Sequence, residues 1–437
     1  MSLHTKVSGA LKTINDCQVK VSGAWKKCIQ VYVKVNGVWK SCFQNAFKFT
    51  INTQATTSGE KRGAIPFTAH NVSETLTVYW GDGKTSTIKA ANYSSLNDSA
   101  ASIHTYTTAG TYTITVFCTN WSNMRLWGED GGFVSIDSTF QDVFRQTVIS
   151  IDTPLPTLVS LEYGLEAAFS QCRKLKTIPA GLFDNITGAK NFNECFFHCD
   201  SLTSIPAGLF DNITGAKNFN DCFSYCNSLT SIPSGLFDKQ TDATYFAWCF
   251  YNCKALTSIP SGLFDKNPNV VHFAGTFENC TSIKSIPSGL FDKNTKVTTF
   301  EECFEGCTSI KSIPSGLFDK NTLVRNFTSV FEHCTSLTTV PQKLFDKNRA
   351  VEYISYAFID CDSLSTFTIY IGSSKIGDGD ANRFAYSSIS STLDKTKRIV
   401  YVPANSTTYT SFQNAEIDAR YGGAYKSNIT LKTYTPA

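Results

Sequence analysis

The sequence has no excess of charge of either sign. Its 437 residues contain 39 Lys and Arg and 36 Asp and Glu, a formal net charge of +3, and the basic residues form no block. Nucleic-acid-binding proteins carry clustered basic residues, so we expect no nucleic-acid partner. Long apolar runs are missing as well, so we expect no transmembrane span and no membrane insertion.

Signals for export and for catalysis are missing too. Residues 1–16 contain no apolar core of the kind that secretory signal peptides have, so we expect no export by that route. The sequence also contains no nucleophile elbow, phosphate-binding loop or metalloprotease motif. We therefore expect a protein that is not an enzyme and that needs no cofactor and no metal.

A strictly periodic repeat is the strongest feature that the sequence does have. Proline, cysteine and phenylalanine each recur at an interval of 27 without an insertion. The positions are Pro179, Pro206, Pro233, Pro260, Pro287, Pro314 and Pro341; Cys172, Cys199, Cys226, Cys253, Cys280, Cys307, Cys334 and Cys361; and Phe169, Phe196, Phe223, Phe250, Phe277, Phe304, Phe331 and Phe358. A fixed period of this length indicates units of one shape that stack on one another.

Each unit combines a segment in which apolar and polar residues alternate with a segment in which apolar residues recur every three or four positions. Leu-Thr-Ser-Ile-Pro at residues 202–206 alternates apolar and polar residues and predicts a short strand that Pro ends. Phe192, Phe196 and Cys199 are spaced as on one face of a helix. We therefore predict strand–turn–helix units and an α/β solenoid whose parallel strands lie about 4.8 Å apart.

The ends of the array differ from its middle. Val148 and Ile151 continue the apolar pattern one period ahead of the first full unit, which predicts a degenerate capping unit. The register is lost after Phe367. We predict the solenoid with its N-terminal cap at residues 121–367, and a β-rich C-terminal cap at residues 368–437.

The unit resembles the repeat of the BspA-like leucine-rich-repeat family. The resemblance is carried by Phe-x-x-Cys-x-Ser-Leu-x-x-Ile-Pro and the Leu-Phe-Asp that follows, and residues 400–406 resemble the terminal unit of such arrays. It covers about residues 145–415. The resemblance implies a recognition solenoid without catalysis, of the kind found on bacterial surfaces and in phage structural proteins.

Residues 1–43 contain a shorter repeat. Two Val-Ser-Gly triplets and one Val-Asn-Gly triplet begin at residues 7, 21 and 35, which are equally spaced. Ser-Gly and Asn-Gly between alternating apolar residues predict β-hairpins, which we expect to join in a small meander. Val-Lys-Val-Asn-Gly-Val-Trp-Lys at residues 33–40 resembles N-terminal segments of phage tail proteins, which implies an attachment segment.

Residues 44–120 form a different module. Trp-Gly-Asp-Gly at residues 80–83 and His-Thr-Tyr at residues 104–106, followed by Gly110 and Tyr112, resemble the motifs of PKD-type immunoglobulin-like domains. The resemblance implies a β-sandwich that serves as a spacer or an adhesion module. For His104 we expect a structural hydrogen bond.

The cysteines predict a buried position rather than a metal site. We call each position within the repeat a slot. The slot four residues before the repeated Cys holds Cys in some units and Ala, Thr or Val in others, which is typical of a small buried position. Side chains stacked in one direction also make disulfides between units awkward. A thiolate metal site at Cys195, Cys199, Cys222 and Cys226 is the weaker alternative, because this spacing departs from that of zinc sites.

Two other groups of candidate metal ligands are weak. His198 and His333 occupy the same slot five units apart, which is about 24 Å at one strand spacing per unit. Asp378, Asp380 and Asn382 resemble the start of a calcium-binding loop, but the Gly and Glu of such a loop are missing from its sixth and twelfth positions. We interpret the second group as a solvated loop.

Aromatic residues at positions that face away from the core are the candidate binding residues. They are Phe197, Tyr225, Tyr245, Trp248, Tyr251 and His272. Aromatic side chains give a large contact area at a low entropy cost, so contact with a ligand is one interpretation. Packing against a neighbouring subunit or domain is the other. Glu301, Glu302 and Glu305 form an acidic patch to which the same two interpretations apply.

Together these features favour a phage virion protein of the tail, such as a fibre or tip protein. Residues 1–43 would bind other virion proteins, the sandwich would be a spacer, and the solenoid would bind a host cell-surface protein or glycan. Synthesis in the host cytoplasm would keep the cysteines reduced. A homo-oligomer such as a trimer is compatible with this hypothesis.

Two other hypotheses remain open. A bacterial cell-surface adhesin fits the solenoid and the sandwich equally well, although the missing export signal counts against it. An accessory chain of a carbohydrate-active enzyme is the third hypothesis, and it would require hydrolysis by the isolated chain.

Overall fold

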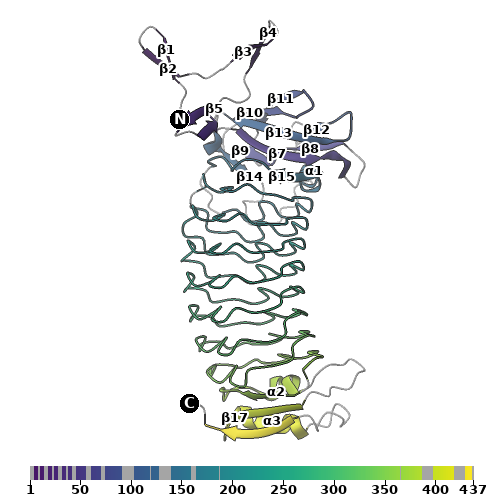
Figure 1. Cartoon of the computed structure of the whole chain (residues 1–437), viewed down its shortest axis with the longest axis vertical. Coiled ribbons are helices and arrows are strands. Elements are labelled where there is room, and N and C mark those ends of the chain that lie inside the picture. The colour runs from purple at the N-terminus through teal and green to yellow at the C-terminus, as the bar shows by residue number, and fades with distance from the viewer. Residues whose placement is uncertain are drawn as a thin grey trace.

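The computed structural model is rich in β-structure, with few helices and several sheets (Figure 1). None of the helices in the described part of the chain has the length and the apolar character of a membrane span. The structure describes residues 4–7, 10–13, 18–21, 24–27, 32–35, 38–41, 46–55, 61–69, 74–90, 103–118, 120–126, 139–158, 164–186, 188–364, 366–385, 397–417 and 429–435.

Three antiparallel hairpins come first. The pairs are β1 (His4–Val7) with β2 (Ala10–Thr13), β3 (Gln18–Val21) with β4 (Ala24–Lys27), and β5 (Tyr32–Val35) with β6 (Val38–Ser41). The hairpins are confirmed, and their closing pairs recur at the equal spacing of the sequence triplets. Among the described residues each hairpin is a two-stranded sheet of its own, so the predicted continuous meander is wrong. The Ser-Gly and Asn-Gly turns lie outside the described residues.

A five-stranded sheet follows, in the order β11-β10-β13-β7-β15. Its strands are β7 (Ala46–Asn52), β10 (Glu74–Tyr79), β11 (Thr85–Ala90), β13 (Thr111–Cys118) and β15 (Val148–Ile151). Two short antiparallel pairs accompany it, β8 (Arg62–Ala64) with β12 (Ile103–Thr105) and β9 (Phe67–Ala69) with β14 (Met124–Leu126). The short helices here are η1 (Thr53–Ala55), η3 (Trp121–Asn123) and α1 (Thr139–Thr147).

The two sequence motifs of this part meet in its core. The buried Trp80 ring stacks on His104 at 4.9 Å, and the Tyr106 hydroxyl donates to the Trp80 carbonyl oxygen at 2.8 Å. His104 Nε2 lies 2.8 Å from Asp82 Oδ2, so the structural hydrogen bond expected of His104 is confirmed. Burial raises the pKa of Asp82, but hydrogen bonds from His104 and from the backbone N–H of Lys84 bring it below its ordinary value.

Strand β15 joins this sheet to the repeats. It pairs antiparallel with β7, with a bulge between Val148 and Ser150. On its other side Ser150 forms a parallel bridge with Thr177 of the first unit. The boundary predicted at residue 120 therefore leaves one strand of the sheet outside the module, and the apolar pattern around Val148 belongs to a strand that both parts share.

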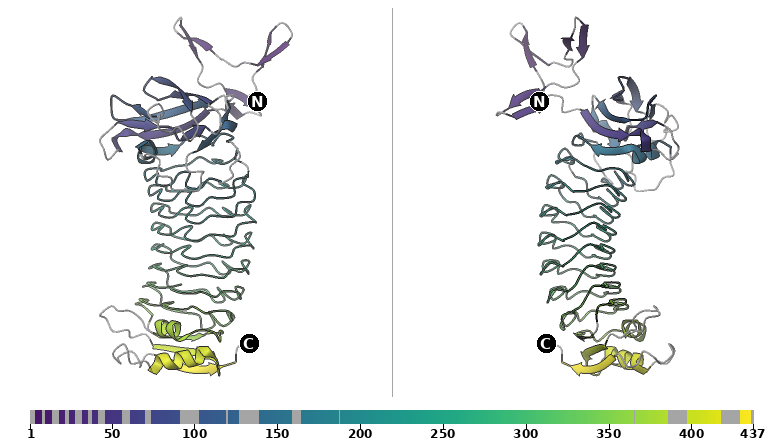
Figure 2. Two further views of the ribbon diagram at one scale, coloured as in Figure 1. Left: turned by 180° about the vertical axis from the view of Figure 1, so that it is seen from behind. Right: turned by 45° about the vertical axis from the view of Figure 1, so that its right-hand side comes forward.

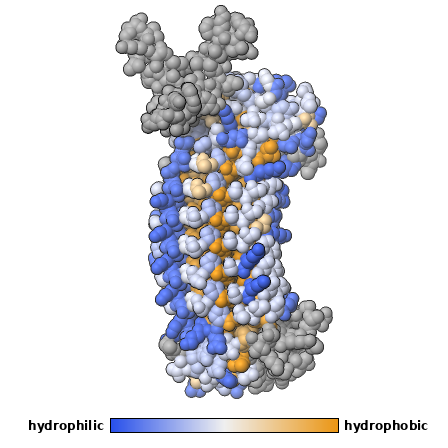
Figure 3. All heavy atoms as spheres, viewed as in Figure 1, coloured by the Kyte–Doolittle hydropathy of each residue, from blue (hydrophilic) through white to orange (hydrophobic). Residues whose placement is uncertain are grey.

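From residue 164 to residue 364 the chain winds in units of the predicted length that lie one on the next along the long axis (Figures 1 and 2). Parallel bridges connect each unit to the next. They are Asn191–Asn218, Asn218–Tyr245, Tyr245–His272, His272–Thr299, Thr299–Asn326 and Asn326–Tyr353. We call this region the repeat stack. On the face in Figure 3, hydrophilic side chains follow one edge of the stack and a narrow apolar stripe runs beside them.

The segment predicted to be a helix is not helical. The N–H groups of Glu194, Phe196 and His198 donate to carbonyl oxygens of the next unit, at 3.0, 2.8 and 2.8 Å. The N–H groups of Cys195 and Phe197, which lie between them, close tight turns within the unit. A helix would direct all these donors along its own axis. The prediction is wrong because successive turns bury the same apolar residues that a helix would bury.

Residues with positive φ make this arrangement possible. In this segment they occupy two slots of every unit and are Ala167, Glu194, Asp221, Trp248, Gly275, Glu302, Ser329 and Tyr356 in the first slot, and Gln171, His198, Tyr225, Asn252, Asn279, Gly306, His333 and Asp360 in the second. A left-handed backbone costs a residue other than Gly about 1 kcal/mol. The recurrence of this cost in every unit indicates that hydrogen bonds between units offset it.

The segment predicted to be a strand contributes less pairing than expected. Each unit makes about one backbone hydrogen bond there, such as Thr230 N to Thr203 O and Thr257 N to Thr230 O, both 3.3 Å. Only one bridge within the described part of the stack, Ser312–Thr339, falls in this segment. The units therefore pair chiefly through the segment that carries the phenylalanines.

Identical side chains form columns inside the stack. The rings of Phe196, Phe223 and Phe250 lie 5.3 and 5.7 Å apart and are almost parallel. The Cys226 thiol donates to the Phe196 carbonyl oxygen at 3.4 Å, and burial raises the pKa of Cys172 to about 12. The cysteines in the described part of the chain are all buried. The prediction of a small buried slot is confirmed.

A column of amide side chains lies beside the phenylalanines. It consists of Gln240, Asn267, Asn294, Asn321 and Asn348, which are almost completely buried. Each amide nitrogen donates to two backbone carbonyl oxygens of the preceding unit. For Asn294 Nδ2 the acceptors are Phe264 O at 3.0 Å and Asn267 O at 2.8 Å. Both carbonyl groups also accept a backbone N–H, Phe264 O from Asn267 and Asn267 O from Val270, so the Asn294 amide is a second donor that connects the two units.

The C-terminal part is not built from strands alone. Its parallel strands are β16 (Thr366–Tyr370), β17 (Lys397–Pro403) and β18 (Ile429–Tyr434), and its helices are α2 (Asp378–Ala385) and α3 (Thr407–Ile417). The predicted β-rich cap therefore also contains helices. Asp378, Asp380 and Asn382 belong to α2 and not to a loop, and Asp380 Oδ1 accepts from Ser355 Oγ at 2.6 Å. The resemblance to a calcium loop is not realised.

We predict that Asn294→Ala lowers the free energy of unfolding by about 1 to 3 kcal/mol, because it removes two buried hydrogen bonds that connect neighbouring units. Urea denaturation of the variant and the parent measures the difference. Lys293→Ala changes the adjacent exposed side chain and should stay within about 0.5 kcal/mol of the parent. Equal effects of the two substitutions would contradict a structural role for the amide column.

Candidate functional site

Five of the six predicted binding residues form two groups, and Trp248 is the sixth. Phe197, Tyr225 and Tyr251 are partly buried and touch in series, with ring centroids 5.6 and 4.9 Å apart. Tyr245 and His272 are exposed and lie 5.7 Å apart in the column of parallel bridges. The structure thus brings together residues that the sequence separates by about one unit.

Trp248 is an exposed residue with an unusual backbone. Its φ is 53° and its side chain is 38% exposed. The side chain lies over Gly275 of the next unit, where an added Cβ would come within 2.2 Å of the indole Nε1. The indole N–H donates to the Glu278 carboxylate. Gly275 therefore makes room for the indole, and Glu278 fixes its orientation.

His198 is a member of the aromatic group that the sequence did not indicate. Its ring stacks on Tyr225 at 4.0 Å, and its Nδ1 lies 3.0 Å from Asp200 Oδ1. From the sequence, His198 was considered only as a metal ligand. His198 could have been recognised from its slot, because the next unit carries Tyr225 at the same position.

Three carboxylates gather beside Trp248. One oxygen each from Glu278, Glu302 and Glu305 lies within 4.8 Å of the others. In the described part of the chain this is the one group of three such ligand atoms, so the thiolate alternative at Cys195, Cys199, Cys222 and Cys226 gains no support. No ion is assigned to this acidic group.

The predicted acidic patch is only partly correct. Glu302 and Glu305 belong to the cluster, but Glu301 Oε2 accepts from Asn326 Nδ2 at 3.0 Å. Glu278 was missed because it stands almost one full unit before Glu302 in the sequence. Its slot, one period before Glu305, is the signal that links it to the cluster.

Partial burial and mutual repulsion make these carboxyls weak acids. Burial first, and then the charge of Glu302, raises the pKa of Glu278 to about 7. Burial first, and then the charges of Glu278, Glu332 and Glu302, raises the pKa of Glu305 to about 8. The cluster therefore retains protons near neutral pH, although nothing covers it completely.

These residues form one continuous surface, which we call the aromatic–acidic face. It consists of Phe197, His198, Tyr225, Trp248, Tyr251, Glu278, Glu302 and Glu305. Tyr251 connects the two halves, because its hydroxyl lies 3.4 Å from that of Tyr225 while the charges of Glu278 and Glu305 help to raise its pKa. The face can contact a ligand through rings at one end and carboxylates at the other.

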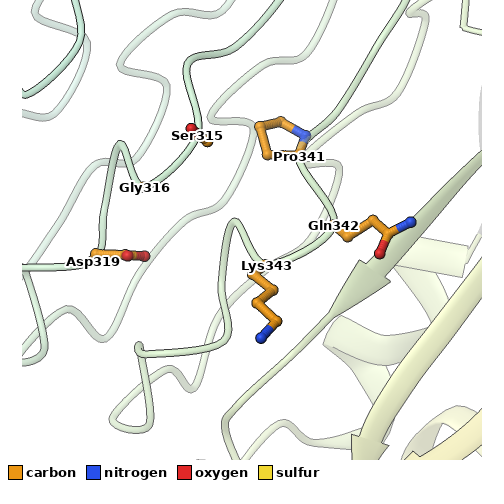
Figure 4. Close-up of a pocket in the computed structure, with 6 residues that line it drawn as sticks. All are labelled: Ser315, Gly316, Asp319, Pro341, Gln342 and Lys343. Carbon is orange, nitrogen blue, oxygen red and sulfur yellow. The ribbon is translucent and has the colours of Figure 1, made fainter.

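An open depression of about 580 Å³ lies elsewhere on the stack. It is lined by Ser315, Gly316, Asp319, Pro341, Gln342 and Lys343, which belong to turns of two adjacent units (Figure 4). Its two charged side chains, Asp319 and Lys343, point in different directions in Figure 4. Ligand pockets are mostly enclosed and apolar, so this depression resembles a gap between turns.

Comparisons with known proteins give no family. No family profile matches the chain, and no curated protein matches it. The solved structure titled "Crystal structure of TLR13-ssRNA13 complex" is similar over 53% of this chain and 53% of that chain, at 11% sequence identity and a TM-score of 0.09. The chain thus spans about half of that structure, and a TM-score this low supports no argument about fold or function.

We predict that Glu305→Gln stabilises the protein at pH 9 by roughly 1 kcal/mol and has little effect at pH 4. The stability that comes from protonated Glu305 is complete below its unfolded pKa of 4.5 and is lost as the pH rises through its folded pKa of about 8. Thermal denaturation at the two pH values measures this. Glu352→Gln, at an exposed ion pair with Arg325, should give no gain at pH 9. The same shift for Glu305→Gln at both pH values would contradict the role of charge repulsion.

Proposed function

We propose that the chain is a non-catalytic phage virion protein of the tail, such as a fibre or tip protein. In this proposal the repeat stack is a leucine-rich-repeat solenoid of the BspA-like kind that recognises a host cell-surface protein or glycan. The sheet around β7 is a PKD-type immunoglobulin-like spacer, and the hairpins β1 to β6 bind other virion proteins. The protein would be made in the host cytoplasm and carried on the virion.

The aromatic–acidic face is the observation that supports recognition. Trp248 is exposed although its ring is large and apolar, and Gly275 and Glu278 hold it in one orientation. Exposed aromatic side chains in fixed positions are typical of binding surfaces. Packing against a neighbouring subunit, for example in a homotrimer, is the second interpretation of the same residues, and it fits a fibre protein as well.

The hairpins support assignment to a virion. They recur at equal intervals with one register, and their sequence resembles N-terminal segments of phage tail proteins. A bacterial cell-surface adhesin is the alternative function. The stack and its aromatic–acidic face suit an adhesin equally well, but the repeated hairpins have no evident role in one.

Mass spectrometry on purified phage particles, beside a washed cell-envelope fraction of the source, tests the proposal. We expect peptides of this chain in the particles at a ratio to the tail proteins that is constant between preparations. A major capsid protein provides the control for particles that contaminate the envelope fraction. Peptides confined to the envelope would contradict the virion proposal and favour the adhesin.

A further inference from the structure

We infer that the aromatic–acidic face binds arginine side chains of a basic protein segment. This inference rests on the proposal that the repeat stack is the recognition part of the chain, and it names the chemistry of the partner. Two features support it, an exposed indole whose orientation is fixed and a group of carboxylates that has no Lys or Arg partner among the described residues.

The indole provides the first feature. Trp248 lies over the backbone of Gly275 on one side, while 38% of its side chain remains open to solvent. A cation is attracted to the face of an indole more than to the face of any other side chain. Because Glu278 already accepts from the indole N–H, the ring is oriented before a partner arrives.

The carboxylates provide the second feature. Among the described residues no Lys or Arg forms an ion pair with Glu278, Glu302 or Glu305, whereas Glu352 pairs with Arg325 and Asp200 with Arg173. Glu332 of the next unit adds a further negative charge, which helps to raise the pKa of Glu305. Like charges this close to one another are unfavourable, so the carboxyls keep protons near neutral pH until a cation replaces them. A cationic partner would displace these protons and supply the positive charge that no Lys or Arg among the described residues supplies.

The combination favours arginine over other ligands. A guanidinium group stacks on an aromatic ring and donates to carboxylates at the same time, whereas an ammonium group is a more strongly hydrated point charge. A divalent metal ion would use the carboxylates but not Trp248. A neutral glycan would use Trp248 but would leave the carboxylates uncompensated.

The length of the face favours a segment with several basic residues. The aromatic–acidic face extends from Phe197 to Glu305, over five successive units. At a spacing of about 4.8 Å per unit this corresponds to about 19 Å. An extended segment could therefore place one arginine against Trp248 and others near Tyr225 or Glu302.

Calorimetric titration of the purified full chain with an oligo-arginine and an oligo-lysine peptide of equal length tests the inference. We expect the arginine peptide to bind more tightly, and Trp248→Ala to weaken its binding about fivefold and remove the preference for arginine. Glu302→Gln combined with Glu305→Gln should weaken both peptides. Tyr353→Ala, at another exposed ring, and Asp265→Asn, at an exposed carboxylate in another slot, serve as matched controls and should bind like the parent.

Equal binding of the two peptides, unchanged by Trp248→Ala, would overturn the inference and leave only a nonspecific acidic surface. Binding of calcium alone, or of a neutral oligosaccharide alone, would overturn it as well. Trp248→Phe keeps an aromatic ring, so it provides a second test if Trp248→Ala does not fold, and it should retain the preference for arginine. The titration uses purified protein, so its outcome does not depend on whether the chain occurs in particles.

Discussion

The rest of the structure depends on backbone hydrogen bonds between successive units. Every second N–H group in the segment that contains Glu194, Phe196 and His198 donates to the next unit. The N–H groups between them close turns, which requires two left-handed residues in each unit. Because every unit meets its neighbours through the same bonds, a residue's slot fixes its position. The aromatic and acidic residues therefore recur at regular intervals, and the backbone bonds that hold them there do not involve their side chains.

This division separates the residues that build the stack from those that can vary. Inward slots hold buried columns of phenylalanine, cysteine and asparagine, and the cysteine and asparagine side chains donate to carbonyl oxygens of the preceding unit. Outward slots change from ring to carboxylate between neighbouring units, as from Tyr251 to Glu278. The change has no evident benefit for packing, because the outward side chains are partly exposed. We therefore propose that recognition occurs at the outward slots, whereas the buried thiols have a structural role.

The sequence predicted which residues are buried better than it predicted the backbone that buries them. The period, the hairpins and the small cysteine slot follow from the pattern of residues along the chain, and the bond of His104 follows from the motif to which it belongs. The helix did not, because the spacing of Phe192, Phe196 and Cys199 reports burial and not φ. Helices α2 and α3 were missed because the repeat ends there and no second copy defines a pattern.

The candidate site could be predicted only in part. Tyr225, Trp248 and Tyr251 were found because aromatic residues in outward slots are conspicuous, and Glu302 and Glu305 because they lie close together in the sequence. Glu278 and Gly275 act one unit away from their partners, so they become visible only when the slots are aligned. A left-handed Trp248 has no signature in a single sequence, since bulky residues seldom adopt that conformation.

Deletion of one complete unit tests the central claim most directly, that identical bonds join every unit to the next. Residues 281–292 and 308–319 have the same sequence, so removal of residues 281–307 restores an identical junction. Our account predicts that this variant unfolds in one cooperative thermal transition close to that of the full chain. It also predicts that removal of residues 282–307, one residue fewer, disrupts the stack, because every following side chain loses its slot. Similar thermal transitions for the two variants would contradict the account.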